Sequence, residues 1–282
     1  MINILSDSYH APLKDVTMSD FIVQSIGLSR HFGNVIAVDS LDLAVEEGRI
    51  FGLLGPNGAG KTTTIKILTT LLAPTSGRGV IAGFDVVKEP RKVRKVIGYV
   101  PQMLSADANL TGYENLLIFA KIYEVPRKEL KERIEQAIAS MGLSDFAHKL
   151  VRTYSGGMIR RLEIAQSAIH HPRVLFLDEP TVGLDPLARR TVWEMIRRLR
   201  DEYNTTIFLT THMMDEADAL CDEIGIMHKG KLVAVGSPSE LKRITSAETL
   251  DEVFIHYTGS SIESGGSFLE VQRKRQTARR LG

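Results

Sequence analysis

Residues 55–62 read Gly-Pro-Asn-Gly-Ala-Gly-Lys-Thr, a complete G-x-x-x-x-G-K-[ST] phosphate-binding loop. The preceding run, residues 49–54, is short and apolar, as a buried parallel strand should be, and a helix-forming run follows the loop. Glycines let successive backbone N–H groups turn toward a phosphate, because no Cβ obstructs the close approach. The loop and its flanks therefore predict a nucleoside triphosphatase with an α/β core.

The side chains of this loop have separate expected roles. Lys61 reaches the β- and γ-phosphates of the nucleotide, and Thr62 supplies a hydroxyl to Mg²⁺. The positive end of the helix that begins near Lys61 adds a field that favours the anion. We expect the nucleotide to be held by Gly55, Pro56, Asn57, Gly58, Ala59, Gly60, Lys61, Thr62 and Thr63.

Two adjacent carboxylates, Asp178 and Glu179, end a second apolar strand, Val-Leu-Phe-Leu, and a proline stops it. Phosphoryl transfer needs separate groups for the metal and for the attacking water. Asp178 is therefore expected to hold Mg²⁺ and Glu179 to polarise the water. The alternative, an acidic strand end that only caps the next helix, is disfavoured by the phosphate loop upstream.

A third strand pattern, the β-branched run at residues 205–211, ends directly before His212. Ligands of α/β sheets bind at the carboxyl ends of the strands, so a histidine at this place can contact a γ-phosphate. Without the other motifs, an ordinary loop histidine would be the better interpretation.

A further motif, Tyr-Ser-Gly-Gly-Met, precedes the Asp-Glu strand and opens a helical pattern. At this point the sequence resembles the ATP-binding cassette (ABC) family. Ser155, Gly156 and Gly157 match the core of the family's signature motif, and the resemblance implies that they bind the γ-phosphate held by the opposite subunit. Tyr154 and Met158 depart from the commonest signature, Leu-Ser-Gly-Gly-Gln. Neither supplies the phosphate-binding amides, so we expect activity to be kept.

Four more positions match the family in the expected order, within about residues 21–258. Gln102 matches the glutamine that contacts Mg²⁺ and senses the membrane partner. Asp185 matches the residue that links the two nucleotide sites across a dimer. His212 matches the histidine that holds the γ-phosphate, and Phe32 lies where the family places the ring that stacks on adenine.

The resemblance implies a P-loop NTPase (RecA-like) α/β core with an antiparallel β subdomain and an inserted α-helical subdomain. Alternating apolar residues at 21–44 predict antiparallel strands with a turn at Gly33-Asn34, and residues 104–151 read as helices. We expect an N-terminal extension at 1–20, the ATP-binding domain at 21–258 and a flexible basic tail at 259–282.

Composition narrows the function classes. The 282 residues are 43% hydrophobic with a formal net charge of +1, which gives no general bias toward nucleic acid. No apolar run approaches the roughly 18 residues of a membrane helix. Cys221 is the only cysteine, so an internal disulfide is excluded, and we expect it to pack as a small apolar residue. The one tryptophan, Trp193, is expected to pack on the sheet rather than stack on a base.

Two sets of residues in the helical segments could face either the protein or a partner. We expect Leu116, Phe119 and Ile122 to belong to the core rather than to an interface with a membrane permease. Arg160 and Arg161 could orient the signature helix or touch the permease. A solvated helix face is the expectation for at least one of them.

Within the family, the signature with its following Arg-Arg-Leu, and Thr-Leu-Asp-Glu-Val-Phe at 249–254, look like the ATPases of daunorubicin-resistance-type multidrug exporters. The resemblance implies ATP and Mg²⁺ as cofactors and a homodimer or pseudo-symmetric dimer of ATPase subunits. It also implies a separate membrane permease, with this chain at the cytoplasmic face of the membrane.

Two other function classes are weighed against the exporter. A cassette ATPase acting on ribosomes or DNA is disfavoured, because the sequence has neither a second phosphate loop nor a long heptad run. A non-catalytic nucleotide-binding regulator is disfavoured because Lys61, Asp178, Glu179 and His212 are all present.

Overall fold

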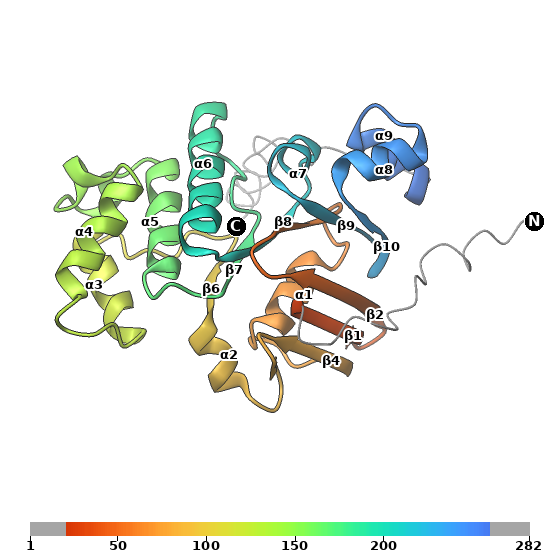
Figure 1. Cartoon of the computed structure of the whole chain (residues 1–282), viewed down its shortest axis with the longest axis horizontal. Helices are drawn as coiled ribbons and strands as arrows, with labels where there is room; N and C mark the ends of the chain where they lie inside the picture. The colour runs from red at the N-terminus through yellow and green to blue at the C-terminus, as the bar shows by residue number, and fades with distance from the viewer. Residues whose placement is uncertain (1–20, 260–282) are drawn as a thin grey trace, which may run out of the picture.

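A computed structural model of the protein describes residues 21–259 (Figure 1). The predicted extension at 1–20 and residues 260–282 of the predicted tail lie outside the described residues. Within the described part, no helix is both long and apolar enough to cross a membrane.

A six-stranded sheet forms the centre of the molecule, in the order β10-β9-β3-β8-β7-β6. Its strands are β3 (Ile50–Leu54), β6 (Ile97–Val100), β7 (Val174–Asp178), β8 (Thr206–Thr211), β9 (Glu223–His228) and β10 (Lys231–Gly236). All neighbouring pairs are parallel except β9 with β10. Every residue of β3, β7 and β8 is buried, as expected for strands covered on both faces. Their carboxyl ends therefore meet at one edge of the sheet.

A second sheet, in the order β2-β1-β4-β5, confirms the predicted antiparallel subdomain. It consists of β1 (Phe21–Phe32), β2 (Val35–Glu46), β4 (Ser76–Ile81) and β5 (Phe84–Asp85). The turn lies at Gly33-Asn34, where Gly33 adopts a left-handed φ of 57°. A Cβ placed on Gly60 would overlap the carbonyl oxygen of Ala37 in β2, so this hairpin lies directly against the phosphate loop.

The helices surround the sheet, with α3, α4 and α5 packed on one another at one side in Figure 1. They are α1 (Lys61–Leu68), α2 (Pro90–Val96), α3 (Gly112–Ile122), α4 (Leu130–Ser140), α5 (Gly156–Ala168), α6 (Pro186–Tyr203), α7 (Met214–Leu220), α8 (Pro238–Thr245) and α9 (Leu250–Thr258), with 3₁₀ turns η1 (Ser144–Phe146) and η2 (Val151–Thr153). Thr111 starts α3 with a capping box to Glu114, in agreement with the predicted cap.

The helical layer corrects one core prediction. Leu116 is fully buried and Phe119 packs against the core, as expected, but Ile122 is 66% exposed. The inward face of α3 carries Leu116 and Ala120, four residues apart, and the helical period turns Ile122 away from them. Cys221 is buried, as predicted, and burial raises the pKa of its thiol well above the ordinary value.

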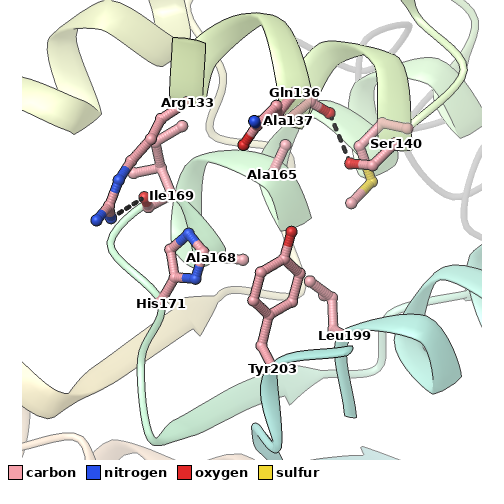
Figure 2. A pocket seen from close by; sticks show the side chains of 11 residues that line it. Arg133, Gln136, Ala137, Ser140, Ala165, Ala168, Ile169, His171, Leu199 and Tyr203 are labelled. Carbon is pink, nitrogen blue, oxygen red and sulfur yellow. Dashed lines mark hydrogen bonds between the residues drawn. The ribbon is translucent and has the colours of Figure 1, made fainter. Parts of the chain in front are cut away.

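A small cavity of about 40 Å³ lies between α4, α5 and α6 (Figure 2). His171 and Tyr203 meet edge to face beside it, and Arg133 donates to the carbonyl of Ile169 at 3.4 Å. A cavity of this size holds about three water molecules at most. None of the predicted site residues lines it.

Candidate active site

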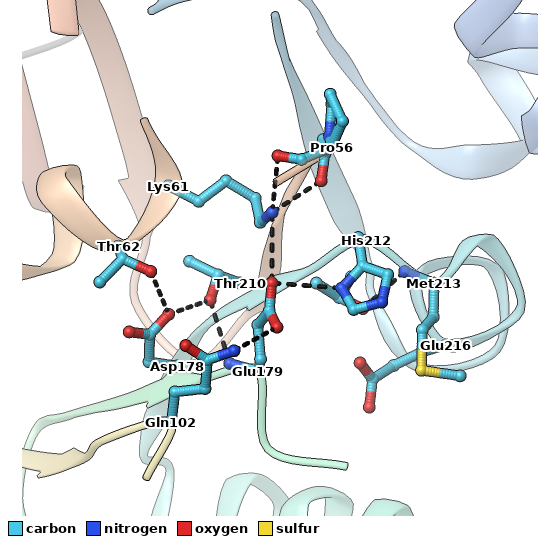
Figure 3. A network of polar contacts seen from close by, with 12 residues as sticks. Pro56, Lys61, Thr62, Gln102, Asp178, Glu179, Thr210, His212, Met213 and Glu216 are labelled. Carbon is cyan, nitrogen blue, oxygen red and sulfur yellow. Dashed lines mark hydrogen bonds and ion pairs between the residues drawn. The ribbon is translucent and has the colours of Figure 1, made fainter. Parts of the chain in front are cut away.

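The carboxyl ends of the parallel strands bring most of the predicted catalytic groups, all except Asp185, into one cluster (Figure 3). Lys61 is the first residue of α1, directly after the loop that follows β3, Asp178 ends β7 and Glu179 follows it. His212 directly follows β8, and Gln102 comes shortly after β6. Four segments that are distant in sequence thus converge at the edge where α/β sheets bind their ligands.

Glu179 contacts side chains from three other segments of this cluster. Its Oε1 lies 3.3 Å from Lys61 Nζ and 3.2 Å from His212 Nδ1, and its Oε2 accepts a hydrogen bond from Gln102 Nε2 at 2.9 Å. The backbone of Glu179 is in the left-handed region, with φ 49°, and its N–H is held by the carbonyl and hydroxyl oxygens of Thr210. Such strain in a residue other than glycine persists where the surroundings fix it, and it clusters at functional sites.

The charges of Lys61 and Glu179 set each other's protonation. Burial alone would raise the pKa of Glu179, but the hydrogen bond from His212 and the charge of Lys61 outweigh it and lower the pKa. Burial lowers the pKa of Lys61, against the attraction of Glu179 and Asp178. The carboxylate is therefore ionised at neutral pH and can take a proton from water.

Asp178 has one satisfied and one unsatisfied oxygen. Its Oδ1 accepts from Thr62 Oγ1 at 3.1 Å and from Thr210 Oγ1 at 2.6 Å. Its buried Oδ2 has no hydrogen-bond partner within residues 21–259. A buried carboxylate oxygen without a partner is costly, and together with the Thr62 hydroxyl it supplies the oxygen ligands that Mg²⁺ prefers. The residues present thus fit a magnesium ion.

The phosphate loop needs glycine for space and for conformation. Gly58 and Gly60 have φ values of 81° and 107°, and a Cβ on Gly55 would overlap the carbonyl oxygen of Met227. Lys61 Nζ donates to the carbonyls of Gly55 at 2.7 Å and Pro56 at 3.1 Å, which closes the loop on itself. Asn57 and Gly58 form the exposed tip of the loop, and Ala59 is buried. Thr62 and Thr63 lie in the first turn of α1.

The signature residues lie apart from this cluster. Ser155 is the exposed N-cap of α5 and accepts from the N–H of Met158 at 3.3 Å. Gly156 is also exposed, and a Cβ on Gly157 would come within 2.9 Å of the Ala188 side chain in α6. The signature therefore presents the N-terminus of a helix, a place that favours anions, at the surface.

Two other predicted residues lie at the surface. Asp185 is the exposed N-cap of α6 and accepts from Ala188 N at 2.9 Å, next to the signature. Phe32 ends β1 at the tip of the hairpin and is 46% exposed, with the Arg30 guanidinium 4.6 Å from the centre of its ring. Neither residue shares in the polar contacts of Glu179.

The substituted signature residue Tyr154 has an internal role. It is buried, and its hydroxyl donates to the carbonyl of Phe146 at 2.7 Å. Met158 is half-buried and packs against the core.

Sequence reasoning missed Glu216, which lies one helical turn after His212. It is 1% exposed, and its Oε1 accepts from Thr181 Oγ1 at 2.7 Å and from Trp193 Nε1 at 2.9 Å. Burial raises the pKa of Glu216 despite these bonds. Trp193 packs against the core, as predicted, and also ties α6 to α7. The one-turn spacing from His212 was the available signal.

The prediction of a solvated face for Arg160 or Arg161 is wrong. Arg160 is buried and donates to the carbonyls of Pro101 and Gln102. Arg161 is half-buried and donates to the carbonyl of Met141 at 2.8 Å. Both guanidinium groups are drawn inward by backbone carbonyls, which the helical pattern alone does not reveal.

Comparison with known proteins decides the family. A family model described as ABC transporter matches residues 38–182, about half of the chain, and a shorter match to an AAA domain covers 151–214. The chain belongs to the ABC transporter ATPases. It is therefore an ATP-binding ATPase, and the predicted family and fold are confirmed.

Relatives and a solved structure agree with this membership. The daunorubicin/doxorubicin resistance ATP-binding protein DrrA of Streptomyces peucetius is 44% identical over 228 residues, which cover 81% of this chain and 69% of that protein. DrrA3 of Streptomyces coeruleorubidus, a daunorubicin resistance ATP-binding protein, is 42% identical over 84% of this chain and 74% of that protein. A structure titled as the ATP binding subunit of an ABC transporter superposes with a TM-score of 0.76 at 27% identity, covering 84% of this chain and 99% of that one.

Proposed function

We propose that this ABC ATPase is the nucleotide-binding subunit of a drug-resistance-type exporter and drives a separate membrane permease. The observation that carries the proposal is the division of the site within one chain. A buried cluster for hydrolysis lies at the strand ends, and an exposed signature helix lies apart from it. The identity of 42–44% to daunorubicin resistance ATP-binding proteins supports the exporter class.

The residues of the strand-end cluster divide the chemistry between them. Asp178 and Thr62, with Gln102 beside them, would hold Mg²⁺, which would neutralise charge on the phosphates. Glu179 accepts the proton of the attacking water. Lys61 exchanges its carboxylate partner for phosphate oxygens, and His212 orients Glu179 and contacts the γ-phosphate.

The remaining nucleotide contacts come from the loop and from the hairpin. The backbone amides of residues 55–63 surround the phosphates, and the exposed Phe32 ring stacks on adenine. The cation–π contact with Arg30 supports that ring from one side.

Two copies complete the sites between them. The backbone amides of Ser155, Gly156 and Gly157 face the phosphate held by the loop of a second ATPase subunit, identical or pseudo-symmetric, and Asp185 links the two sites. ATP thus draws the subunits together and hydrolysis releases them. The pair acts on the permease at the cytoplasmic face of the membrane.

Affinity purification tests the partner. The full chain is tagged and recovered with ATP from detergent-solubilised membranes of its native cell, and the bound proteins are identified by mass spectrometry against an untagged control. A stoichiometric multi-helix membrane protein is the expected result. Recovery of ribosomal proteins or nucleic acid without a membrane protein would leave the ATPase chemistry intact and overturn the exporter.

A further inference from the structure

Two buried charged side chains of α5 form hydrogen bonds with the segment that follows β6. Arg160 and Glu163 are 3% and 2% exposed and lie one turn apart, with Arg160 Nη1 3.1 Å from Glu163 Oε2. A buried ion pair stabilises a fold little by itself, because desolvation of the charges offsets their attraction. The hydrogen bonds that the pair makes to the neighbouring backbone are therefore its main contribution.

The guanidinium holds the beginning of the segment 101–106. Arg160 Nη1 donates to the carbonyl of Pro101 at 2.7 Å, and Nη2 donates to the carbonyl of Gln102 at 2.8 Å. The planar fork of arginine matches two successive acceptors, whereas the ammonium of lysine is a point donor on a flexible stem. Arginine thus fixes both peptide groups at once.

The carboxylate holds the end of the same segment. Glu163 Oε1 accepts from the N–H and the hydroxyl of Ser105, the latter at 3.2 Å, and from the N–H of Ala106 at 3.2 Å. A cation thus binds carbonyls at one end and an anion binds amides at the other. Met103 and Leu104, between the residues bound by Arg160 and those bound by Glu163, are exposed.

The gripped segment reaches the catalytic centre through one side chain. Gln102 Nε2 donates to Glu179 Oε2 at 2.9 Å (Figure 3), and the carbonyl of the same residue is the acceptor for Arg160. We propose that Arg160 and Glu163 are positioning residues, which fix the segment 101–106 on the signature helix so that Gln102 meets Glu179. The inference rests on the proposed catalytic role of Glu179.

The first test is Arg160→Gln in the full chain, with Arg161→Gln as the matched loss of an arginine from the same helix. A misplacement of about 1 Å away from the chemistry costs up to roughly 100-fold in rate. We expect Arg160→Gln to lower kcat by about 10- to 100-fold, with KM for ATP within about twofold. Arg161→Gln is expected to stay within about twofold of the wild-type kcat. Equal kcat values for the two variants would overturn the proposal.

Amide hydrogen exchange gives a readout that is independent of activity. Peptides covering 102–106 should exchange faster in Arg160→Gln than in the wild type and in Arg161→Gln, because the segment loses its anchor. Unchanged exchange in this segment would contradict the claim that Arg160 holds it in place.

A double-mutant cycle with Gln102→Ala separates positioning from general destabilisation. If Arg160 acts through Gln102, the double variant should be no slower than Gln102→Ala alone, since both changes remove one interaction. Effects on kcat that multiply would overturn the proposal.

If Arg160→Gln does not fold, Arg160→Lys keeps the charge and loses the fork. It should still exchange faster at 102–106 and lower kcat, and wild-type values for both would reject the positioning role. Glu179→Gln tests the hydrolytic role separately: wild-type turnover in that variant would remove the proposed function, whatever the Arg160 variants do.

Discussion

The two halves of the nucleotide site differ in how completely this chain satisfies them. In the strand-end cluster, the Lys61 and Glu179 side chains are 4% and 5% exposed and are paired with each other. At the signature, Ser155 and Gly156 are exposed, and the hydrogen bond of Ser155 runs back into its own helix. The Lys61–Glu179 pair is thus preorganised within one folded core. The signature residues Ser155 and Gly156, in contrast, lie at the surface.

The largest effect is expected at the buried end, from Glu179→Gln. The amide can still accept the bond from His212 or Gln102, so the fold should persist, but it cannot take a proton from water. Loss of a general base lowers kcat by roughly 10³-fold. Phosphate release at saturating ATP measures the change, with Glu216→Gln as the control for the same substitution at another buried glutamate. Turnover in Glu179→Gln close to that of the control would show that Glu179 is not the general base.

The helix that carries the signature is anchored at its other end by His170. Its Nε2 lies 3.0 Å from the carbonyl of Ile97 and its ring stacks on Tyr123 at 3.7 Å. Burial lowers the pKa of His170 to about 4 from an ordinary value of 6.5. Between these values the unfolded chain binds a proton that the folded chain does not, so stability falls as the pH falls from 6.5 to 4.

At about 1.4 kcal/mol per pH unit, the loss reaches about 3 kcal/mol. Urea unfolding of the wild type and of His170→Phe between pH 6.5 and 4 measures this loss as the difference between the two proteins. The titration of the carboxylates affects both proteins equally and cancels in that difference. The wild type should lose about 3 kcal/mol more than the variant. Parallel pH curves would show that this end of the helix is not a buried anchor.

At the exposed end, Gly156→Asp should leave the fold intact and weaken function. A Cβ there meets only Leu184 Cδ2, at 3.9 Å, and an acid in the first turn of a helix is favourable by a few tenths of a kcal/mol. The same charge repels a phosphate, and loss of such a stabilising site lowers kcat by about 100-fold. Gly156→Ala, which adds a side chain without charge, should change kcat by only a few-fold. Equal activity in both variants would argue against an anion site at the signature.

The smallest effect is expected at Asp185, where substitutions separate helix capping from the proposed link between the two nucleotide sites. Asp185 is the N-cap of α6, so its replacement by alanine should lower the free energy of unfolding by about 1 kcal/mol. Replacement by asparagine, which caps equally well, should change it by almost nothing. Thermal or urea unfolding measures both. If its charge links the two sites, both variants lower ATPase activity. Stability that is equal in the two variants would show that the cap is unimportant.

Local sequence patterns predicted much of the fold and of the polar cluster at the strand ends. The phosphate loop, the apolar strands ending at Asp178 and before His212, and the capped start of α3 each follow from residues adjacent in sequence. Parallel strands end at one edge, so the meeting of Lys61, Glu179 and His212 follows from those patterns.

What the sequence did not predict depends on contacts between distant segments. Arg160 and Glu163 look like solvated charges in a helical run, but the backbone of residues 101–106 supplies their partners. Glu216 likewise depends on Thr181 and Trp193, which come from two other segments. Burial of charge is set by tertiary packing, and a single helix pattern does not contain it.

ATP-dependent dimerisation tests directly whether the exposed signature binds the nucleotide of a second subunit. The full chain carrying Glu179→Gln is analysed by sedimentation velocity with ATP and Mg²⁺, beside the same chain with Gly156→Asp added. We expect a stable dimer for the single variant, because hydrolysis no longer releases it, and a monomer for the double variant, because the exposed signature no longer accepts the phosphate. A single variant that stays monomeric under ATP, or a double variant that dimerises equally well, would contradict this expectation.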